Sequence, residues 1–325
     1  MYYNYFQEKI MWSLQNIETN LQSRIIGHQE VIREIIIAFF SGGHVLLEWS
    51  PGLWKTSLPK CFSCLLAQDY KRVQSTPDLL PSDILGVEIY DELKKEFIIK
   101  KGPIFADILF IDEINRAGPK LQSALLEAME EKQVTIGNIQ FSLPENYMVI
   151  ATSNPHDHNG TYELPYAQKD RFLFQLQMKT PTQVEEIAIM KWFEGLRKNM
   201  PTGIISQKEI FEIKENIKKV VCSERMYEYI KNIIFATREH PDLIKYLETG
   251  ISPRGSISIL KAAKTQAYLE GRDLIIPEDI QRVVYWVLRH RLLPNYRAIW
   301  EEKTADDIIS MILALVPLLW WNENF

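Results

Sequence analysis

Residues 108–117, ILFIDEINRA, are the most informative stretch of the chain, because four apolar residues run directly into two carboxylates. A short, continuously apolar run of this kind is typical of a strand that is buried on both faces of a sheet. Asp112 and Glu113 then stand at the strand end, where an Asp can hold the water shell of Mg²⁺ and a Glu can polarise a water molecule. Two solvated carboxylates at a strand end would give the same pattern. This stretch therefore indicates a magnesium site only together with a second motif elsewhere in the chain.

That second stretch is residues 44–57, HVLLEWSPGLWKTS, which reads as a strand, a turn and the start of a helix. In a phosphate-binding loop, backbone N–H groups and the helix N-terminus converge on phosphate. Lys55 would reach the β- and γ-phosphates, and the Thr56 hydroxyl would hold Mg²⁺. The strict pattern G-x-x-x-x-G-K-[ST] is not met, because Trp49 and Trp54 occupy both glycine positions. A strand-to-helix turn with a capping lysine is the alternative for this stretch alone, but the acidic pair favours the phosphate site.

Short apolar runs alternate with helical patterns along the first half of the chain, which predicts a parallel sheet covered by helices. Two segments interrupt this order and predict inserted β-hairpins, residues 87–100 and residues 133–143, the latter around Gly137-Asn138. After residue 205 the strand patterns end and helical periodicity takes over. The five expected strands are residues 44–49, 71–75, 106–112, 147–152 and 172–178.

The sequence therefore predicts an α/β fold with a parallel five-stranded sheet, followed by an all-helical domain. We expect an N-terminal helical segment over 1–25, a nucleotide-binding α/β domain over 26–195 and a helical domain over 205–325. Capping boxes at Ser206 and Thr304, and Pro277 in a first helical turn, mark the starts of three helices of the last domain.

Composition excludes several classes of protein. The 325 residues carry 37 Lys and Arg against 42 Asp and Glu, and a net charge of −5 argues against a nucleic-acid coat. Three cysteines do not make a disulfide framework, and the start of the chain lacks the pattern of a signal peptide. The longest apolar run, residues 309–321, is too short to span a bilayer and contains Pro317. We therefore expect a cytoplasmic protein with no membrane or nucleic-acid partner.

Two further groups could suggest metal binding. Cys61 and Cys64 share a helix face, and His156 and His158 share a loop. Neither pair has the additional ligands that a zinc site needs. We interpret the cysteines as packing residues and the histidines as part of a solvated loop.

Long blocks of the chain closely resemble the MoxR family of AAA+ ATPases, a group of P-loop NTPases. Four of the blocks are RVQSTPDLLPSDILG (72–86), GPIFADILFIDEINRAGPKLQSALLEAMEEKQVTIG (102–137), VIATSNP (149–155) and GTYELPYAQKDRF (160–172). The resemblance continues through GISPRGSISILKAAKTQAYLEGRDLIIPEDI (250–280) and VLRHRL (287–292), and it covers roughly Ile25 to Arg291.

The resemblance implies a role for each matching residue, with ATP and Mg²⁺ as cofactors. Asn154 would orient the attacking water, Arg171 would be the arginine finger that reaches a neighbouring subunit, and Arg254 would be the sensor on the helical lid. Glu113 would be the catalytic glutamate of the Walker B motif, which polarises the attacking water. The implied nucleotide-binding residues are Ile26, Gly27, Pro51, Gly52, Leu53, Trp54, Lys55, Thr56, Ser57 and Asp112, of which Thr56 and Asp112 would also hold the metal.

The family also implies a homo-hexameric ring, since an arginine finger acts between subunits. Its members are chaperone-like proteins that remodel or mature partner proteins, among them proteins with von Willebrand factor A domains. The two inserted hairpins match those that face the ring's pore or a partner in this group.

The tryptophans at 49 and 54 depart from the family's glycines, and Tyr166 departs from its usual Glu. A side chain before the lysine should obstruct the phosphate pocket. The chain is then either an inactive scaffold that assembles without turnover, or an active ATPase in which TGA codons for glycine have been read as Trp. We favour the second hypothesis, because the other motif residues are all retained.

Overall fold

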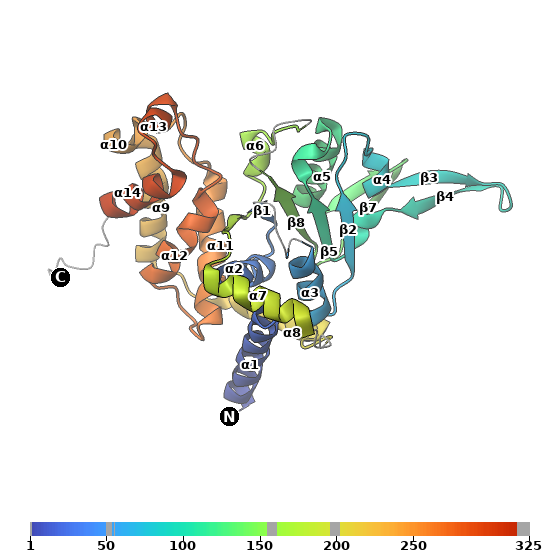
Figure 1. The fold of residues 1–325 in the computed structure, drawn as a ribbon, viewed down its shortest axis with the longest axis horizontal. Coiled ribbons are helices and arrows are strands. Elements are labelled where there is room, and N and C mark those ends of the chain that lie inside the picture. Colours follow the sequence, from blue (N-terminus) through green and yellow to red (C-terminus); the bar gives the residue numbers. More distant parts are fainter. Residues whose placement is uncertain (1, 50–53, 55, 155–160, 196–201, 317–325) are drawn as a thin grey trace. The chain divides into compact units, whose positions relative to one another are not determined.

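The structure, a computed structural model, describes residues 2–49, 54, 56–154, 161–195 and 202–316. The chain divides into two compact units (Figure 1). The first comprises residues 1–172 and 176–211, and the second comprises residues 173–175 and 212–325. The short segment 173–175 therefore belongs with the C-terminal helices although it lies far from them in the sequence.

A five-stranded parallel sheet forms the centre of the first unit, which confirms the predicted α/β fold. Its strand order is β2-β5-β8-β1-β9. All five residues of β5 are buried, as the unbroken apolar run predicts. The strands are β1 (Val45–Trp49), β2 (Tyr70–Gln74), β5 (Ile108–Asp112), β8 (Met148–Ser153) and β9 (Phe174–Met178).

Helices surround this sheet, and their apolar faces complete the core. In α2, nine of twelve residues are buried. The first-unit helices are α1 (Tyr2–Gln22), α2 (Gln29–Phe40), α3 (Ser57–Leu65), α4 (Pro81–Leu85), α5 (Pro119–Glu131), α6 (Tyr166–Lys169) and α7 (Gln183–Gly195). Within the described ranges, no helix is both long enough and apolar enough to cross a bilayer.

Both predicted hairpins are present. The first pairs β3 (Gly86–Asp91) with β4 (Glu96–Lys101) and extends away from the sheet (Figure 1). The second pairs β6 (Gln133–Ile136) with β7 (Ile139–Ser142) across a turn in which Gly137 has φ +60°. The ammonium group of Lys101 lies 4.7 Å from the ring centre of Phe105 and 5.1 Å from that of Phe141, which ties the two hairpins together.

His44, just before β1, is a buried histidine that the fold holds neutral. The Val149 N–H donates to its Nδ1 over 3.0 Å, and its Nε2 lies 3.2 Å from the Met129 carbonyl oxygen. Burial lowers the pKa of His44 from 6.5 to about 4. The ring accepts at one nitrogen and donates at the other, so protonation would break the bond to Val149.

We expect this histidine to make the protein less stable in mild acid. Because the folded-state pKa lies below the unfolded value, the unfolded chain binds more protons between the two values. The stabilisation is complete above pH 6.5 and is lost as the pH falls to about 4, by about 3 kcal/mol in total. Urea unfolding across this range should show a shallower pH dependence for His44→Gln. The matched variant His240→Asn, at a position that caps α10, should keep the slope, and an unchanged slope in His44→Gln would refute the assignment.

The second unit is helical, as predicted. Its helices are α8 (Gln207–Lys219), whose first residues belong to the first unit, α9 (Glu224–Glu239), α10 (Pro241–Ile244), α11 (Pro253–Leu269), α12 (Pro277–Leu288), α13 (Tyr296–Trp300) and α14 (Ala305–Leu315). The predicted capping boxes form, since the Glu209 carboxylate accepts from the Ser206 N–H and the Asp307 carboxylate from the Thr304 N–H, each over 2.9 Å. Pro277 is the first residue of α12.

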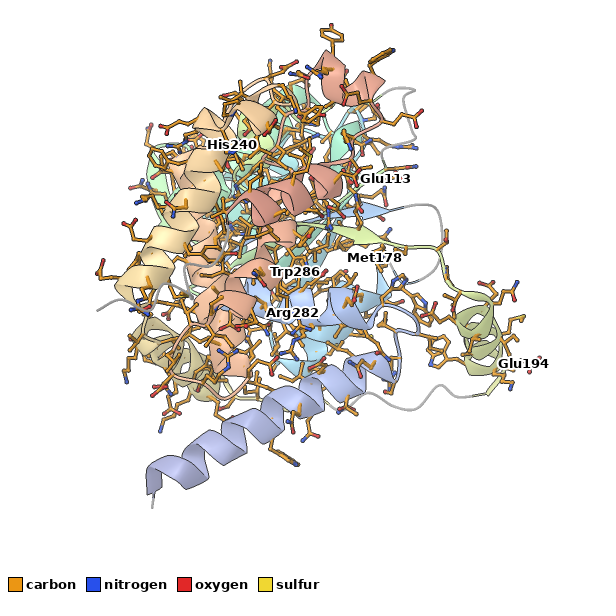
Figure 2. The ribbon with its side chains drawn as sticks, turned by 90° about the vertical axis from the view of Figure 1, so that its left-hand side faces the viewer. Glu113, Met178, Glu194, His240, Arg282 and Trp286 are labelled. Carbon is orange, nitrogen blue, oxygen red and sulfur yellow. The ribbon has the colours of Figure 1, made fainter. Side chains whose placement is uncertain are left out.

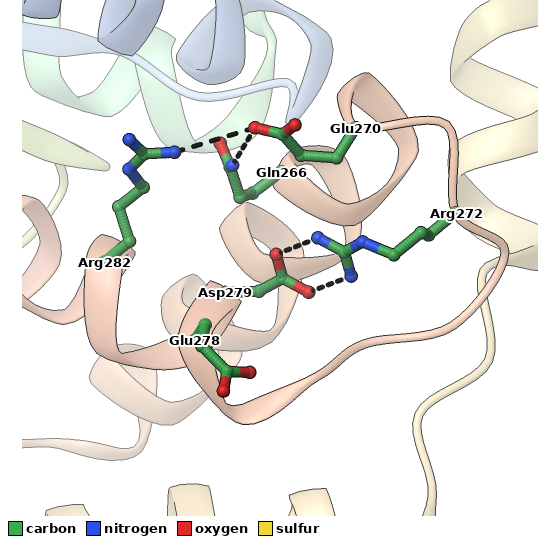
Figure 3. A pocket seen from close by; sticks show the side chains of 6 residues that line it. All are labelled: Gln266, Glu270, Arg272, Glu278, Asp279 and Arg282. Carbon is green, nitrogen blue, oxygen red and sulfur yellow. Dashed lines mark hydrogen bonds and ion pairs between the residues drawn. The ribbon is translucent and has the colours of Figure 1, made fainter.

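A polar hollow between α11 and α12 is lined by side chains that pair with one another (Figure 3). Arg272 donates two hydrogen bonds of 2.6 Å to Asp279, whose side chain is buried. Across the hollow, Arg282 lies 3.6 Å from Glu270. Because each of these two pairs joins opposite charges, the pairs stabilise the connection between α11 and α12.

Candidate functional site

The acidic pair lies at the carboxyl edge of the sheet, where β5 and β8 end side by side. Ile111 is opposite Ala151 in the parallel register, so Asp112 and Thr152 follow as neighbours. The Thr152 hydroxyl donates to Asp112 Oδ1 over 2.9 Å, and the Glu113 N–H donates to the Thr152 hydroxyl over 2.8 Å. Thr152 therefore positions both acids, a role that only its place in an otherwise apolar strand could have suggested from the sequence.

Arg72 holds the other oxygen of the same carboxylate. It extends from β2, which neighbours β5, and its Nη2 donates to Asp112 Oδ2 over 2.8 Å. Asp112 is thus fixed from two strands at once. The sequence gives no sign of this pairing, because it depends on which strand lies beside β5.

Glu113 has a left-handed backbone, with φ +58° and ψ +56°, and it precedes a short 3₁₀ turn (Ile114–Arg116). This conformation is unusual for a residue other than glycine and turns the side chain out of the strand direction. Its carboxylate lies 3.1 Å from Arg116 Nε and accepts from the Gln74 amide over 3.2 Å. Glu113 is labelled in Figure 2. Two polar side chains therefore hold this carboxylate at the edge of the sheet.

Trp54 has a backbone conformation that suits glycine. Its φ is +85°, a region in which a bulky side chain is a marked outlier. Its indole is 7% exposed and packs edge-on against Trp192 of α7, with ring centres 4.7 Å apart. The Trp54 Nε1 is buried with no hydrogen-bond partner among the described residues. The chain thus bends here as it would around a glycine, while an indole fills the adjacent space.

The rest of the predicted phosphate loop is only partly described. Pro51, Gly52, Leu53 and Lys55 lie outside the described residues, as does the side chain of Trp49. Thr56 precedes α3 and Ser57 is its first residue, so both stand at the start of the helix that the motif requires.

The segment expected to seat the adenine is covered by α7. Gly27 has φ +88°, and a Cβ atom built on it would lie 2.9 Å from Glu185 Cδ. Ile26 is half-buried. Burial lowers the pKa of the neighbouring His28, and the Glu185 carboxylate partly opposes this. Since Trp192 also belongs to α7, one helix contacts both this segment and the residue at position 54.

The structure also describes three further predicted site residues, Asn154, Arg171 and Arg254. Asn154 directly follows β8. The Nε of Arg171 lies 3.1 Å from the Glu130 carboxylate on α5. Arg254 is the second residue of α11 and belongs to the second unit.

In the described part of the chain, no group of three or more His, Cys, Asp or Glu residues is arranged to hold a metal ion. Cys61, Cys64 and Cys222 form no disulfide. His156 and His158 fall outside the described residues.

Comparisons with known proteins place the chain in a class. Residues 44–174 match the profile of the ATPase family associated with various cellular activities (AAA), and residues 237–312 match that of the AAA lid domain. The crystal structure of a candidate ATPase from Cytophaga hutchinsonii superposes with a TM-score of 0.90 at 36% identity, covering 97% of each chain. The fold is thus that of an AAA ATPase domain with its lid.

Curated relatives narrow this class. Chaperone MoxR1 of Mycobacterium tuberculosis is 38% identical over 299 residues, 90% of this chain and 79% of its own. Protein MoxR of Methylorubrum extorquens is 30% identical over 92% of this chain and 93% of its own. The chain belongs to the MoxR family of AAA+ ATPases.

Proposed function

We propose that this protein hydrolyses Mg-ATP and uses the energy to remodel or mature partner proteins in the manner of a chaperone. The observation that carries the proposal is the acidic pair fixed by Thr152 at the carboxyl edge of the sheet, where ligands of open α/β sheets bind. The family supports ATP as the nucleotide, and a relative named as a chaperone supports the class of work.

The residue types predicted for this site suit a magnesium nucleotide in their chemistry. A carboxylate and a hydroxyl, from Asp112 and Thr56, are the oxygen donors that Mg²⁺ prefers, and Lys55 would neutralise phosphate charge. Bound Mg-ATP supplies the reactive γ-phosphoryl group. Glu113 would take a proton from the attacking water, which Asn154 would orient.

Two arginines complete the proposed set. Arg254 would approach the phosphates from the lid, and Arg171 would serve the site of a neighbouring subunit. An Arg171 that acts between subunits requires a closed ring, for which we propose a homo-hexamer. In the structure Arg171 is paired with Glu130, so that ion pair would open when Arg171 engages a neighbour.

Trp54 does not suit a bound phosphate, and its backbone favours glycine at this position. A left-handed residue before the lysine lets a backbone N–H face phosphate, but the indole packed on Trp192 takes up adjacent space. We propose that the natural protein has glycine at positions 49 and 54, where TGA codons have been read as Trp. The second candidate function, an inactive scaffold that binds partners without turnover, follows if Trp54 is genuine, and the buried indole favours it.

Reading the gene separates these two candidates. TGA codons at both positions, with glycine found in the corresponding peptides of the native protein by mass spectrometry, would support the ATPase. TGG at both positions would overturn the recoding proposal and leave the scaffold.

The β3–β4 hairpin is the surface that we propose for client proteins. Leu93 at its turn is 97% exposed and Phe97 is 67% exposed, so the hairpin presents several apolar side chains to solvent along with Tyr90, whose ring meets that of Phe97. A protein with a von Willebrand factor A domain is the proposed client class, on family resemblance alone. Proteins retained by the native chain from a lysate of its source should be lost with Leu93→Ser/Phe97→Ser, and retention of the same proteins by that variant would exclude the hairpin.

A further inference from the structure

Three consecutive residues just after Arg171 are held by the helical unit. Arg291 Nη1 donates to the Leu173 carbonyl oxygen over 3.1 Å, and Arg289 Nη1 donates to that of Gln175 over 3.4 Å. Between them, the Phe174 ring meets Trp286 edge-on with ring centres 5.6 Å apart. Trp286, labelled in Figure 2, lies on α12, and both arginines fall within the three residues that follow that helix. These contacts explain why segment 173–175 belongs to the second unit.

Arg291 is the most constrained of these residues. It is only 1% exposed, and a buried cation is costly unless its N–H groups are all directed at acceptors. Besides Leu173, its guanidinium donates to the Val287 carbonyl oxygen over 2.6 Å and to the Ser258 hydroxyl over 3.3 Å. One rigid group thus joins the end of α12, the body of α11 and the residue two positions after Arg171. None of the three can shift alone without leaving a buried donor unpaired.

Arg289 anchors the same segment to the last described helix. Its Nε and Nη2 donate to the two carboxylate oxygens of Asp306 on α14, over 2.7 and 2.9 Å. Such a two-point pair fixes the plane of the guanidinium. The remaining Nη1 is then directed at Gln175. Segment 173–175, which begins two residues after Arg171, is therefore held to α11, α12 and α14.

We propose that Arg291 is a positioning residue that ties Arg171 to the movement of the helical lid. Because segment 173–175 is bonded to the lid and also begins β9 of the sheet, a lid rotation would act on the start of that strand, and only Phe172 separates the segment from Arg171. The placement of Arg171 toward a neighbouring subunit then depends on the lid of its own subunit. This inference rests on the proposed role of Arg171 as the finger in trans.

The test uses Arg291→Met, which keeps an apolar stem of similar length and removes every donor. The matched control is Arg282→Met on α12, an arginine whose side chain is 53% exposed and pairs with Glu270 across the hollow of Figure 3. Both are made in the full chain with glycine at positions 49 and 54. We expect ATP hydrolysis to fall at least about tenfold in Arg291→Met, since misplacing a catalytic group by about 1 Å can cost up to 100-fold. Arg282→Met should stay within about twofold, because exposed ion pairs contribute little.

Mixed rings distinguish positioning from simple damage. An excess of Glu113→Gln subunits gives each Arg291→Met site a neighbour with an intact Arg171. The hydrolysis rate per Arg291→Met subunit should rise at least about threefold, as it should for Arg171→Ala, because the lost group acts on the next subunit. If Arg171→Ala is rescued and Arg291→Met is not, Arg291 serves only its own site and the inference is wrong. If Arg171→Ala is not rescued either, the proposed finger role fails instead.

Hydrogen exchange tests whether Arg291 holds segment 173–175 in place, and it does not depend on ATP hydrolysis. Hydrogen exchange at the amides of residues 172–176 should be at least about tenfold faster in Arg291→Met than in Arg282→Met, since the contacts that hold the segment are lost. Equal exchange in the two variants would overturn the inference, whether or not the parent protein hydrolyses ATP.

Discussion

Replacing Trp54 with glycine should increase the affinity for ATP at least about 100-fold, a gain of about 2.7 kcal/mol in binding free energy. The backbone at this position already has φ +85°, so glycine adopts it without the steric cost that an L side chain meets. The change also removes the indole that packs on Trp192. Titration with a fluorescent ATP analogue, followed by calorimetry, measures the difference directly.

Two companion variants separate the effect of the Trp54 indole on ATP affinity from the effect of a Cβ atom in a left-handed backbone. Trp54→Ala removes the indole but leaves a Cβ in the left-handed conformation, so its affinity should fall between those of the parent chain and of Trp54→Gly. Trp192→Ala removes the ring partner and keeps the indole at position 54, and we expect it to restore no binding. Equal ATP affinity in the parent chain and in Trp54→Gly would show that the indole does not obstruct the site. Absence of binding in both would support the scaffold.

Glu113→Gln, made in the chain with glycine at 49 and 54, should lower the rate of ATP hydrolysis at least about 100-fold, within the range of general-base catalysis. Glutamine has the same shape but no basic oxygen. The backbone N–H of residue 113 should still donate to Thr152, so the edge of the sheet keeps its geometry. ATP affinity should therefore change less than about twofold, since the nucleotide is held by other residues.

Phosphate release and nucleotide titration, performed on the same preparation, test this separation of turnover from binding. Glu127→Gln is the matched control, because it makes the same chemical change at an exposed position of α5. Hydrolysis that survives Glu113→Gln would remove Glu113 from the proposed catalytic role. An equal loss of ATP affinity would assign it to nucleotide binding.

Local pattern was sufficient to predict the strands, both hairpins and the helix caps. Ile108 to Ile111 read as a buried strand because continuous apolar residues need cover on both faces, and Gly137-Asn138 reads as a turn because glycine tolerates positive φ. The caps at Ser206 and Thr304 depend on residues only three positions apart. Each of these features is decided within a few residues, so one sequence carries enough information.

The sequence could not predict contacts between distant segments. Arg72 meets Asp112 only because β2 lies beside β5, and this strand order is a property of the whole sheet. The contacts of α7 with Gly27 and Trp54 likewise join positions more than 100 residues apart. Thr152 could have been suspected as a polar residue in a buried strand, but its partners could not.

The contacts that hold residues 173–175 to the helical unit also limit which fragments of this protein can be studied alone. A fragment that starts at residue 205 contains every helix from α8 onward, but it lacks the carbonyl groups that Arg289 and Arg291 engage. It would also uncover the face of Trp286 that Phe174 contacts. Expressed alone, such a fragment would deprive the buried Arg291 of one of its acceptors and would expose an aromatic ring, and exposed apolar surface of this kind promotes aggregation. An autonomous version of the helical part should therefore include a grafted strand equivalent to residues 173–175.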